Sequence, residues 1–120
     1  MGQRLDMQER VSVMSKLDKV QKYVEKGKEA GLLKLIHDKD KSVRLAAIEG
    51  MGKIGRDDSF NNLVTMLSDD DADIRAASAD ALGVLKNSHA DAHLRYRLGI
   101  EKDAKVVEAI KKAVASLPRD

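Results

Sequence analysis

The sequence predicts an all-α protein in which about three helical pairs stack side by side behind an N-terminal capping segment. The first observation is an internal repeat. Residues 38–55 recur as residues 69–85 after a shift of 31 positions (74 − 43), and more weakly as residues 101–117 after another 32 (106 − 74). The second is that apolar residues in each copy fall at i, i+3, i+4, i+7, i+8 and i+11, on one side of a helix. The third is composition: 42% of the residues are hydrophobic but only 2% are aromatic, so the core must be aliphatic.

Short side chains in the middle of the apolar stripe characterise the repeated helix, and they allow two helices to approach closely. The stripe consists of Val43, Ala46, Ala47, Gly50, Met51 and Ile54, then Ile74, Ala77, Ser78, Ala81, Leu82 and Leu85, then Val106, Ala109, Ile110, Ala113, Val114 and Leu117. An aspartate precedes each stripe by three residues: Asp40, Asp71 and Asp103. Because a carboxylate there can accept an unpaired backbone N–H at the positive end of the helix dipole, we expect these aspartates to begin the helices.

Residues 1–29 are the predicted capping segment. No glycine or proline interrupts residues 5–25, which predicts one long helix or two shorter ones. Its apolar residues at helical spacing are Val13, Leu17, Val20 and Val24. We expect Gly27 to end the helix in a left-handed conformation. The segment lacks the repeat signature, so its expected role is to cover the open apolar edge of the first repeat.

Three repeats follow within a single predicted domain of residues 1–120. Their predicted bounds are residues 30–55, 58–85 and 88–117. Each repeat pairs a short outer helix with the repeated inner helix, and the outer helices are expected at residues 31–37, 59–68 and 90–98. In the turn after the second inner helix, Asn87 is expected to take the left-handed position that glycine usually fills.

The repeated motif reads D-x-D-x-x-V-R-x-A-A-x-x-x-(L/M)-G-x-(I/L). The first copy supplies Asp38, Asp40, Val43, Arg44, Ala46, Ala47, Met51, Gly52 and Ile54. The second supplies Asp69, Asp71, Ile74, Arg75, Ala77, Leu82, Gly83 and Leu85, and departs from the motif at Ser78. In the third, Val107 replaces the arginine and Ala115 the glycine, as in a capping repeat. The motif resembles the short bilin-lyase-type repeats of the HEAT-repeat superfamily. This resemblance implies a right-handed α-α superhelix, a short HEAT-like solenoid, but no particular function.

The resemblance also implies a role for the motif arginines, Arg44 and Arg75. In that superfamily this arginine commonly bonds to aspartates of the preceding turn and forms a ladder along the stack. The expected acceptors here are Asp38, Asp69, Asp70 and Asp71. The alternative is that the two arginines bind an anion.

Charge and composition exclude several classes of function. The 22 basic and 20 acidic residues leave a net charge of +2, too small a field to indicate nucleic-acid binding. The absence of cysteine from the sequence excludes disulfides, thiolate metal sites and cysteine nucleophiles. No apolar run is long enough to cross a bilayer, and residues 1–10 lack the apolar segment of a secretory signal. We therefore expect a cytoplasmic protein with no membrane partner.

The sequence offers one weak candidate metal site. His89 and His93 are four residues apart, so on a helix they would share a side near Asp91, a spacing that can hold a divalent metal. The alternative is a surface pair without metal. The His-Glu pairs of di-iron hydroxylases with a similar fold do not occur here, and no catalytic constellation can be assembled. The expectation is a protein without catalytic activity or cofactor.

The remaining surface indicates a binding module. We expect a concave face of the inner helices to be formed by Leu45, Ile48, Glu49, Ala76, Ala79, Asp80, Glu108, Lys111 and Lys112. Either a segment of another protein docks there, or the capping segment covers its apolar part. An alternative function is binding of nucleic acid or an anionic surface through the lysines of the capping segment. A more distant alternative is an accessory subunit of a lyase or a metal-dependent enzyme.

Overall fold

The computed structural model describes residues 5–119, so residues 1–4 of the predicted capping segment and residue 120 lie outside it. Within that range the chain forms helices and no strands, which confirms the predicted all-α class. The helices are α1 (Met7–Lys26), α2 (Glu29–Leu35), α3 (Lys41–Ile54), α4 (Asp57–Met66), α5 (Ala72–Leu85), α6 (Ala90–Ile100) and α7 (Ala104–Ser116).

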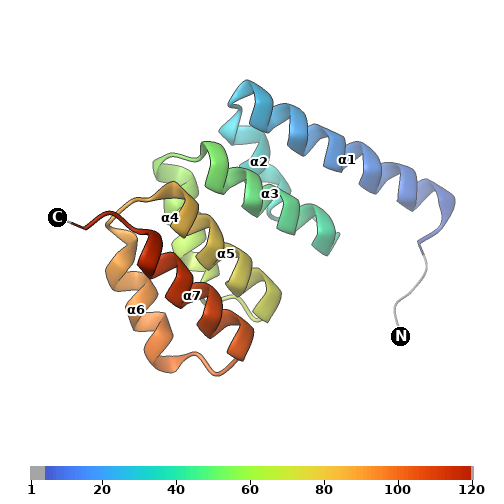
Figure 1. The fold of residues 1–120 in the computed structure, drawn as a ribbon. Helices are drawn as coiled ribbons and strands as arrows, with labels where there is room; N and C mark the ends of the chain where they lie inside the picture. The colour runs from blue at the N-terminus through green and yellow to red at the C-terminus, as the bar shows by residue number, and fades with distance from the viewer. Residues whose placement is uncertain (1–4, 120) are drawn as a thin grey trace.

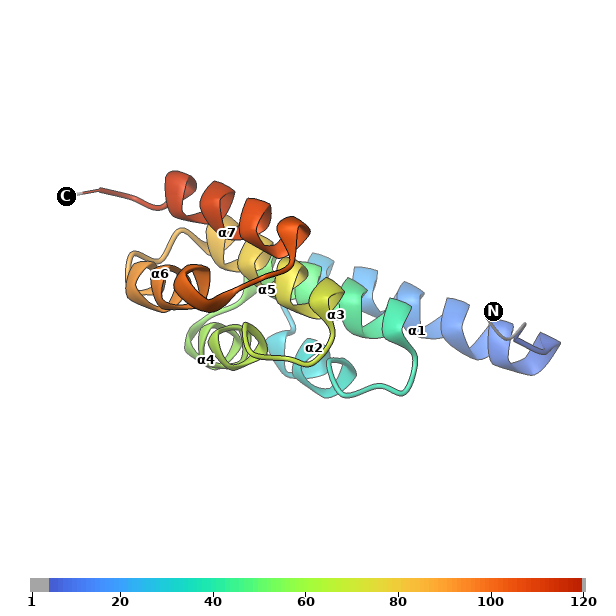
Figure 2. The ribbon, with the colours of Figure 1, turned by 90° about the horizontal axis from the view of Figure 1, so that it is seen from below.

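The helices lie in two layers (Figures 1 and 2). The inner layer consists of α1, α3, α5 and α7, which run side by side in chain order. The outer layer consists of α2, α4 and α6 and lies against one side of the inner layer. The most extensive packing joins neighbouring inner helices, so each repeat contacts mainly the repeats beside it. The chain is therefore a short helical solenoid, as predicted, with extents of 49 × 36 × 17 Å.

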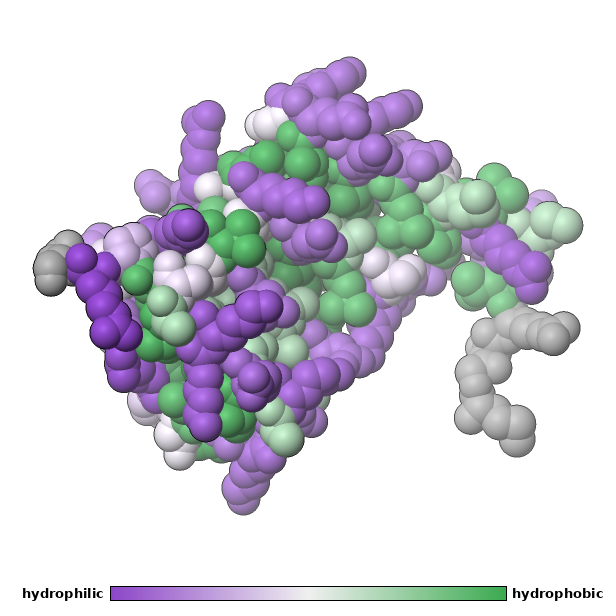
Figure 3. Space-filling model, viewed as in Figure 1, coloured by the Kyte–Doolittle hydropathy of each residue, from purple (hydrophilic) through white to green (hydrophobic). Residues whose placement is uncertain are grey.

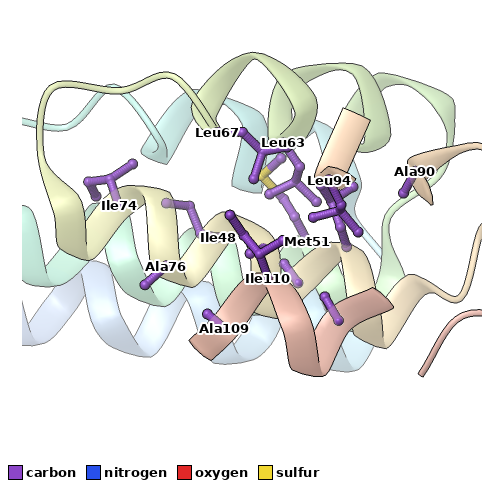
Figure 4. Packing of buried hydrophobic residues seen from close by; sticks show 14 of the residues in the cluster. Ile48, Met51, Leu63, Leu67, Ile74, Ala76, Ala90, Leu94, Ala109 and Ile110 are labelled. Atoms are coloured by element: carbon purple, nitrogen blue, oxygen red, sulfur yellow. The ribbon is translucent and has the colours of Figure 1, made fainter. Parts of the chain in front are cut away.

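The core is aliphatic and lies between the two layers (Figure 4). Its largest completely buried side chains include Leu32 and Leu63 of the outer layer and Ile48, Met51 and Leu82 of the inner layer. Burying a side chain of this kind stabilises the fold by roughly 1.5–3 kcal/mol relative to leaving it exposed. The helical stripes predicted from the repeat thus supply about half of the buried core, and the outer helices supply much of the rest.

Two motif glycines set the spacing of the inner helices. A Cβ atom built on Gly52 would lie 3.0 Å from the Cα of Ala81, and one built on Gly83 would lie 3.0 Å from the Cα of Ala113. These obstacles are backbone atoms, which cannot rotate away, and at Gly83 the Ser116 Oγ lies closer still, at 2.9 Å. Glycine at these positions therefore permits the close contact of α3 with α5 and of α5 with α7.

The predicted helix starts are confirmed. The side chains of Asp40, Asp71 and Asp103 accept the backbone N–H of Ser42, Asp73 and Lys105, at 2.9, 2.8 and 2.9 Å. The capping segment forms a single helix, α1. It ends at Gly27, which is left-handed with φ 65° as expected. The expectation for Asn87 is wrong: the left-handed residue after α5 is Lys86, with φ 55°. Asn87 instead accepts the backbone N–H of His89 with its side chain at 2.9 Å.

Candidate functional site

A furrow runs between α3 and α5 on the face of the inner layer that the outer helices leave open. It has a volume of about 330 Å³. Its lining residues are Leu45, Glu49, Lys53, Ala77, Asp80, Ala81 and Val84. The floor is apolar because the middle of the stripe carries short side chains, and the rims carry the charged groups.

Similar furrows lie on either side of the central one. The furrow between α1 and α3, about 300 Å³, shares Glu49 and Lys53 with it. The furrow between α5 and α7, about 460 Å³, shares Asp80 and Val84. The shared residues form the ridges between neighbouring furrows, so the three furrows lie side by side across the four inner helices, and we call them together the inner-helix groove. On this face, apolar surface lies between charged side chains (Figure 3).

Ile48, Ala76 and Ala79 do not line the groove as the sequence suggested. Ile48 and Ala79 are completely buried, and Ala76 is 8% exposed. Figure 4 shows Ile48 and Ala76 among the packed side chains of the core. The central inner helices α3 and α5 are each covered by an outer helix and by an inner helix on either side. In a single repeat considered alone, these three residues would face solvent. In the stack, the neighbouring repeats bury them.

The corresponding positions of the third repeat are charged because no further repeat covers them. Glu108 and Lys111 occupy on α7 the places that Ala76 and Ala79 occupy on α5, and they are exposed. Among the described residues no helix packs beyond α7, so this stripe meets solvent and is polar. Only Lys112 of the predicted third row lines the groove. The groove thus brings together Leu45, Glu49, Asp80 and Lys112 from the predicted set.

The groove residues that the sequence analysis did not assign to this face include Lys53, Val84 and Lys86. Lys53 and Val84 lie four positions after Glu49 and Asp80, so helical spacing alone could have added them to the same side. Val84 is 58% exposed and is the largest apolar contact that the groove offers. Its neighbour Leu85 is half-buried against the core, which is why the apolar pattern pointed there instead.

The groove carries both signs of charge. Lys53 Nζ lies 3.5 Å from Glu49 Oε1 on the same helix. Partial burial raises the pKa of the Asp80 carboxyl, and Lys112 opposes that shift with a weaker electrostatic attraction. Glu25 and Glu49 lie towards α1, whereas Lys86 and Lys112 lie towards α7. The groove is therefore more acidic at its N-terminal side and more basic at its C-terminal side.

The arginine ladder differs from the expected one. Arg44 Nη1 donates to the backbone carbonyl oxygen of Asp38 at 2.9 Å, and Arg75 Nη1 donates to those of Asp69 and Asp70 at 2.8 and 3.1 Å. The carboxylates of these aspartates are not the acceptors. The Asp38 carboxylate accepts from Lys16 at 2.8 Å, and that of Asp71 lies 2.9 Å from Lys41 Nζ. Both arginines thus donate within their own turns through Nη1. Arg75 also donates through Nε and Nη2 to the Glu101 carboxylate, which occupies its guanidinium fork.

The comparison with protein families agrees with this architecture. A family model described as HEAT repeats matches residues 29–115, which is most of the chain. The chain belongs to the HEAT-repeat family. No curated protein matches it. The matched region begins at α2 and ends within α7, so it covers the three outer and inner helix pairs of the HEAT stack and not α1.

One candidate histidine, His93, lies on the third outer helix of the HEAT stack, and the other, His89, lies in the turn just before it. His93 is on α6, and its ring meets that of Phe60 edge to face, with centroids 6.5 Å apart. Among residues 5–119, no group of three or more His, Cys, Asp or Glu side chains could hold a metal ion. None of the helices in that range is long and apolar enough to span a bilayer.

Proposed function

We propose that this HEAT-repeat protein is a non-catalytic interaction module that binds a segment of another protein in the inner-helix groove. The observation that carries the proposal is the extent of the groove: three neighbouring furrows with apolar lining residues lie between the four inner helices and share their rims. A binding site of this shape suits a helix or an extended segment better than a small molecule. HEAT repeats generally mediate protein–protein interaction, which supports the same function.

The contacts available in the groove indicate how such a segment would be held. Leu45, Ala77 and Val84 offer apolar contact, and burying them on binding supplies the favourable free energy. Glu49 and Asp80 lie on facing rims of the central furrow, and Lys112 lies one furrow further on. Charges at a rim contribute more to orientation and association rate than to affinity. We therefore assign the apolar residues to affinity and the charged ones to orientation.

Site-specific cross-linking tests the assignment. A photoreactive amino acid placed at Val84, which is exposed, should cross-link to a discrete segment of one partner when the protein is expressed in its native cells. Peptide mass spectrometry would identify the segment. The same amino acid placed at Lys111, exposed at the end of the stack, is the control. Equal capture from both positions, or none from Val84, would reject the groove as the binding site.

A charge variant provides the second arm. Val84→Glu combined with Glu49→Lys changes two exposed rim residues and should abolish partner capture while the helical circular-dichroism signal is retained. Lys111→Glu combined with Glu108→Lys should leave capture unchanged. Ile48 is not a suitable target, because a charge at a completely buried position would unfold the protein.

The alternative function, binding of nucleic acid or an anionic surface, would use exposed lysines of α1: Lys19, Lys22 and Lys26. Lys16 is engaged with Asp38, and Asp18 and Glu25 interrupt the row. Phosphate binding must weaken steeply as salt rises, because counterions are released on binding. A titration with duplex and single-stranded probes at several salt concentrations would separate this function from groove binding.

Two finer assignments complete the proposal. The D-x-D-x-x-V-R-x-A-A motif of the first copy supports repeats of the short bilin-lyase type within the HEAT family. The polar composition, with 35% charged residues and no cysteine in the sequence, supports a cytoplasmic location. Fractionation of the native cells would test the location directly.

A further inference from the structure

A strained residue ends the second inner helix of the HEAT stack. Lys86 follows α5 and is left-handed, with φ 55°. It is the one non-glycine residue with positive φ within residues 5–119. A lysine in this conformation is strained because its Cβ crowds the following carbonyl oxygen, whereas glycine has no Cβ. Such strain persists where another interaction favours the residue, so the lysine side chain needs a reason of its own.

The preceding inner helices end without this strain. The shift of 31 residues that relates the first two copies (86 − 55) places Lys86 on Gly55, and α1 ends at Gly27. Both helices carry a lysine shortly before the glycine, at Lys53 and Lys26. A cation there already complements the negative end of the helix dipole. The dipole therefore favours a lysine near the end of α5 but does not require it in the left-handed position.

Lys86 lines the furrow between α5 and α7, which has a volume of about 460 Å³. Lys112 of α7 lines the same furrow. Both lysines are exposed, and no ion pair within residues 5–119 uses either of them. The one carboxylate in the lining, that of Asp80, attracts Lys112 electrostatically but forms no ion pair with it. The furrow therefore carries two ammonium groups that a bound carboxylate can meet.

We propose that Lys86 and Lys112 select an acidic side chain, aspartate or glutamate, on the segment that the groove binds. This inference rests on the proposed function and adds the chemistry of the partner at one furrow. Val84 is 58% exposed and lines the same furrow, so an apolar side chain of the segment can pack there. A carboxylate nearby then accepts charge-assisted hydrogen bonds from the lysines. This gain on binding accounts for a strained lysine where glycine would be more stable.

Other anions suit the furrow less well. Because both lysines are exposed, a free anion paired with them in water would gain little. A small hydrated anion would also leave Val84 and Ala113 uncovered, whereas an acidic residue beside an apolar one uses both kinds of surface. Asp80 on the shared rim would repel a chain of phosphates such as a nucleic acid.

Thermal unfolding tests the strain. Lys86→Gly should raise the midpoint of unfolding by about 2–5 °C, because the crowded Cβ is removed. Lys112→Ala removes the second ammonium group at an exposed helical position and should leave the midpoint nearly unchanged. An unchanged or lower midpoint for Lys86→Gly would show that lysine costs nothing there, and would overturn the argument that its charge is the reason for it.

Selection from a phage-displayed library of random peptides tests the chemistry with a defined probe. Peptides enriched on the wild-type protein should carry aspartate or glutamate within one helical turn of an apolar residue, and they should not bind Val84→Glu. Peptides enriched on Lys86→Gly or Lys112→Ala should keep the apolar residue and lose the acidic one. Lys111→Ala is the control: this exposed lysine of α7 lies outside the furrow, so its peptides should match those of the wild type.

Titration calorimetry with one enriched acidic peptide measures the contact. Lys86→Gly should weaken binding about three- to tenfold, and an acid-to-amide change in the peptide should do the same on the wild type but have little effect on Lys86→Gly. If no peptide is enriched on the wild type, the proposed function and this inference both fail. If peptides are enriched without an acidic preference, or that preference survives Lys86→Gly, the groove stands and the role of the two lysines is wrong.

Discussion

Arg75 and Glu101 form a two-pronged ion pair that joins the second and third repeats. Arg75 Nε and Nη2 donate to the two carboxylate oxygens of Glu101 at 2.9 and 3.0 Å. The Glu101 side chain is only 1% exposed, and Arg97 also donates to it, at 3.0 Å. Hydrogen bonds to both oxygens offset the desolvation cost of this buried carboxylate. Without the carboxylate, the charge of the half-buried Arg75 would have no such compensation. The pair therefore links the inner helix of one repeat to the turn between the outer and inner helices of the next.

We predict that Glu101→Ala lowers the free energy of unfolding by about 3–5 kcal/mol, because it leaves Arg75 as a partly buried charge without its partner. Urea denaturation monitored by circular dichroism would measure the loss. The matched control is Asp91→Ala, which breaks the exposed Arg95–Asp91 pair on α6 and should cost less than about 1 kcal/mol. Similar losses in the two variants would contradict the structural role of the Arg75–Glu101 pair.

Acid should unfold the protein through a small set of carboxylates. Hydrogen bonds from Arg75 lower the pKa of Glu101 from an ordinary 4.5 to about 2, and those from Lys105 and then Lys41 lower the pKa of Asp73 from 3.8 to about 2. Because these pKa values are lower in the folded protein than in the unfolded chain, both groups stabilise the fold above pH 4.5. That contribution disappears as the pH falls from about 4.5 to about 2. We predict a stability that declines steadily over this range.

Urea denaturation at several pH values between 7 and 2.5 would show the decline. Glu101→Gln should reduce its slope, since one linked proton is removed. Asp73→Asn should do the same and should also weaken the contacts of α3 and α7 with α5, which Asp73 bridges through Lys41 and Lys105. A pH dependence identical to that of the wild type in both variants would refute the assignment.

The carboxylate of Glu29 caps a helix in the next repeat. Its Oε2 accepts the Ser59 hydroxyl at 2.6 Å and the backbone N–H groups of Arg56 and Ser59 at 2.6 and 3.2 Å. No side chain of the preceding residue caps α4, so Glu29 replaces a local cap. We predict that Glu29→Ala costs about 1–2 kcal/mol and speeds amide hydrogen exchange at the start of α4. Unchanged exchange there would show that the contact does not stabilise the helix.

The motif glycines should not tolerate even a methyl group. Gly52→Ala and Gly83→Ala place a Cβ about 3.0 Å from backbone atoms of the neighbouring inner helix, and each should cost roughly 1–3 kcal/mol. Gly99→Ala is the control, because a Cβ there meets nothing within 4 Å. Since alanine favours a helix more than glycine does, this variant should be stabilised by up to about 1 kcal/mol. Thermal unfolding of the three variants would establish the order of their stabilities.

The sequence predicted those features that short-range spacing controls. The starts of α3, α5 and α7 were predictable because an aspartate cap bonds to backbone groups only two or three residues away. The aliphatic stripe of each inner helix was predictable for the same reason, and with it the solenoid. Asn87 is the exception, since local propensity favours asparagine over lysine in the left-handed position that Lys86 occupies.

The site was predictable only in part. Leu45, Glu49, Asp80 and Lys112 line the groove as expected, because they lie on a side of the inner helices that no other helix covers. Ile48 and Ala79 were misplaced because their burial depends on a helix about 30 residues away in the sequence. The acceptor of Arg75 was missed for a similar reason: Glu101 is 26 residues distant, and a turn aspartate is nearer along the chain.

By itself the sequence determined the repeat, the helices and the sides on which their apolar residues lie, since these follow from periodicity within a few turns. Only the tertiary structure decided which of those sides meet another helix and which remain free. It buried Ile48 in the core, left Val84 on the rim of the groove and left Met7, Val11 and Met14 exposed on α1. The physical reason is that exposure depends on how many neighbours surround a helix, and the spacing of residues along one helix carries no record of them.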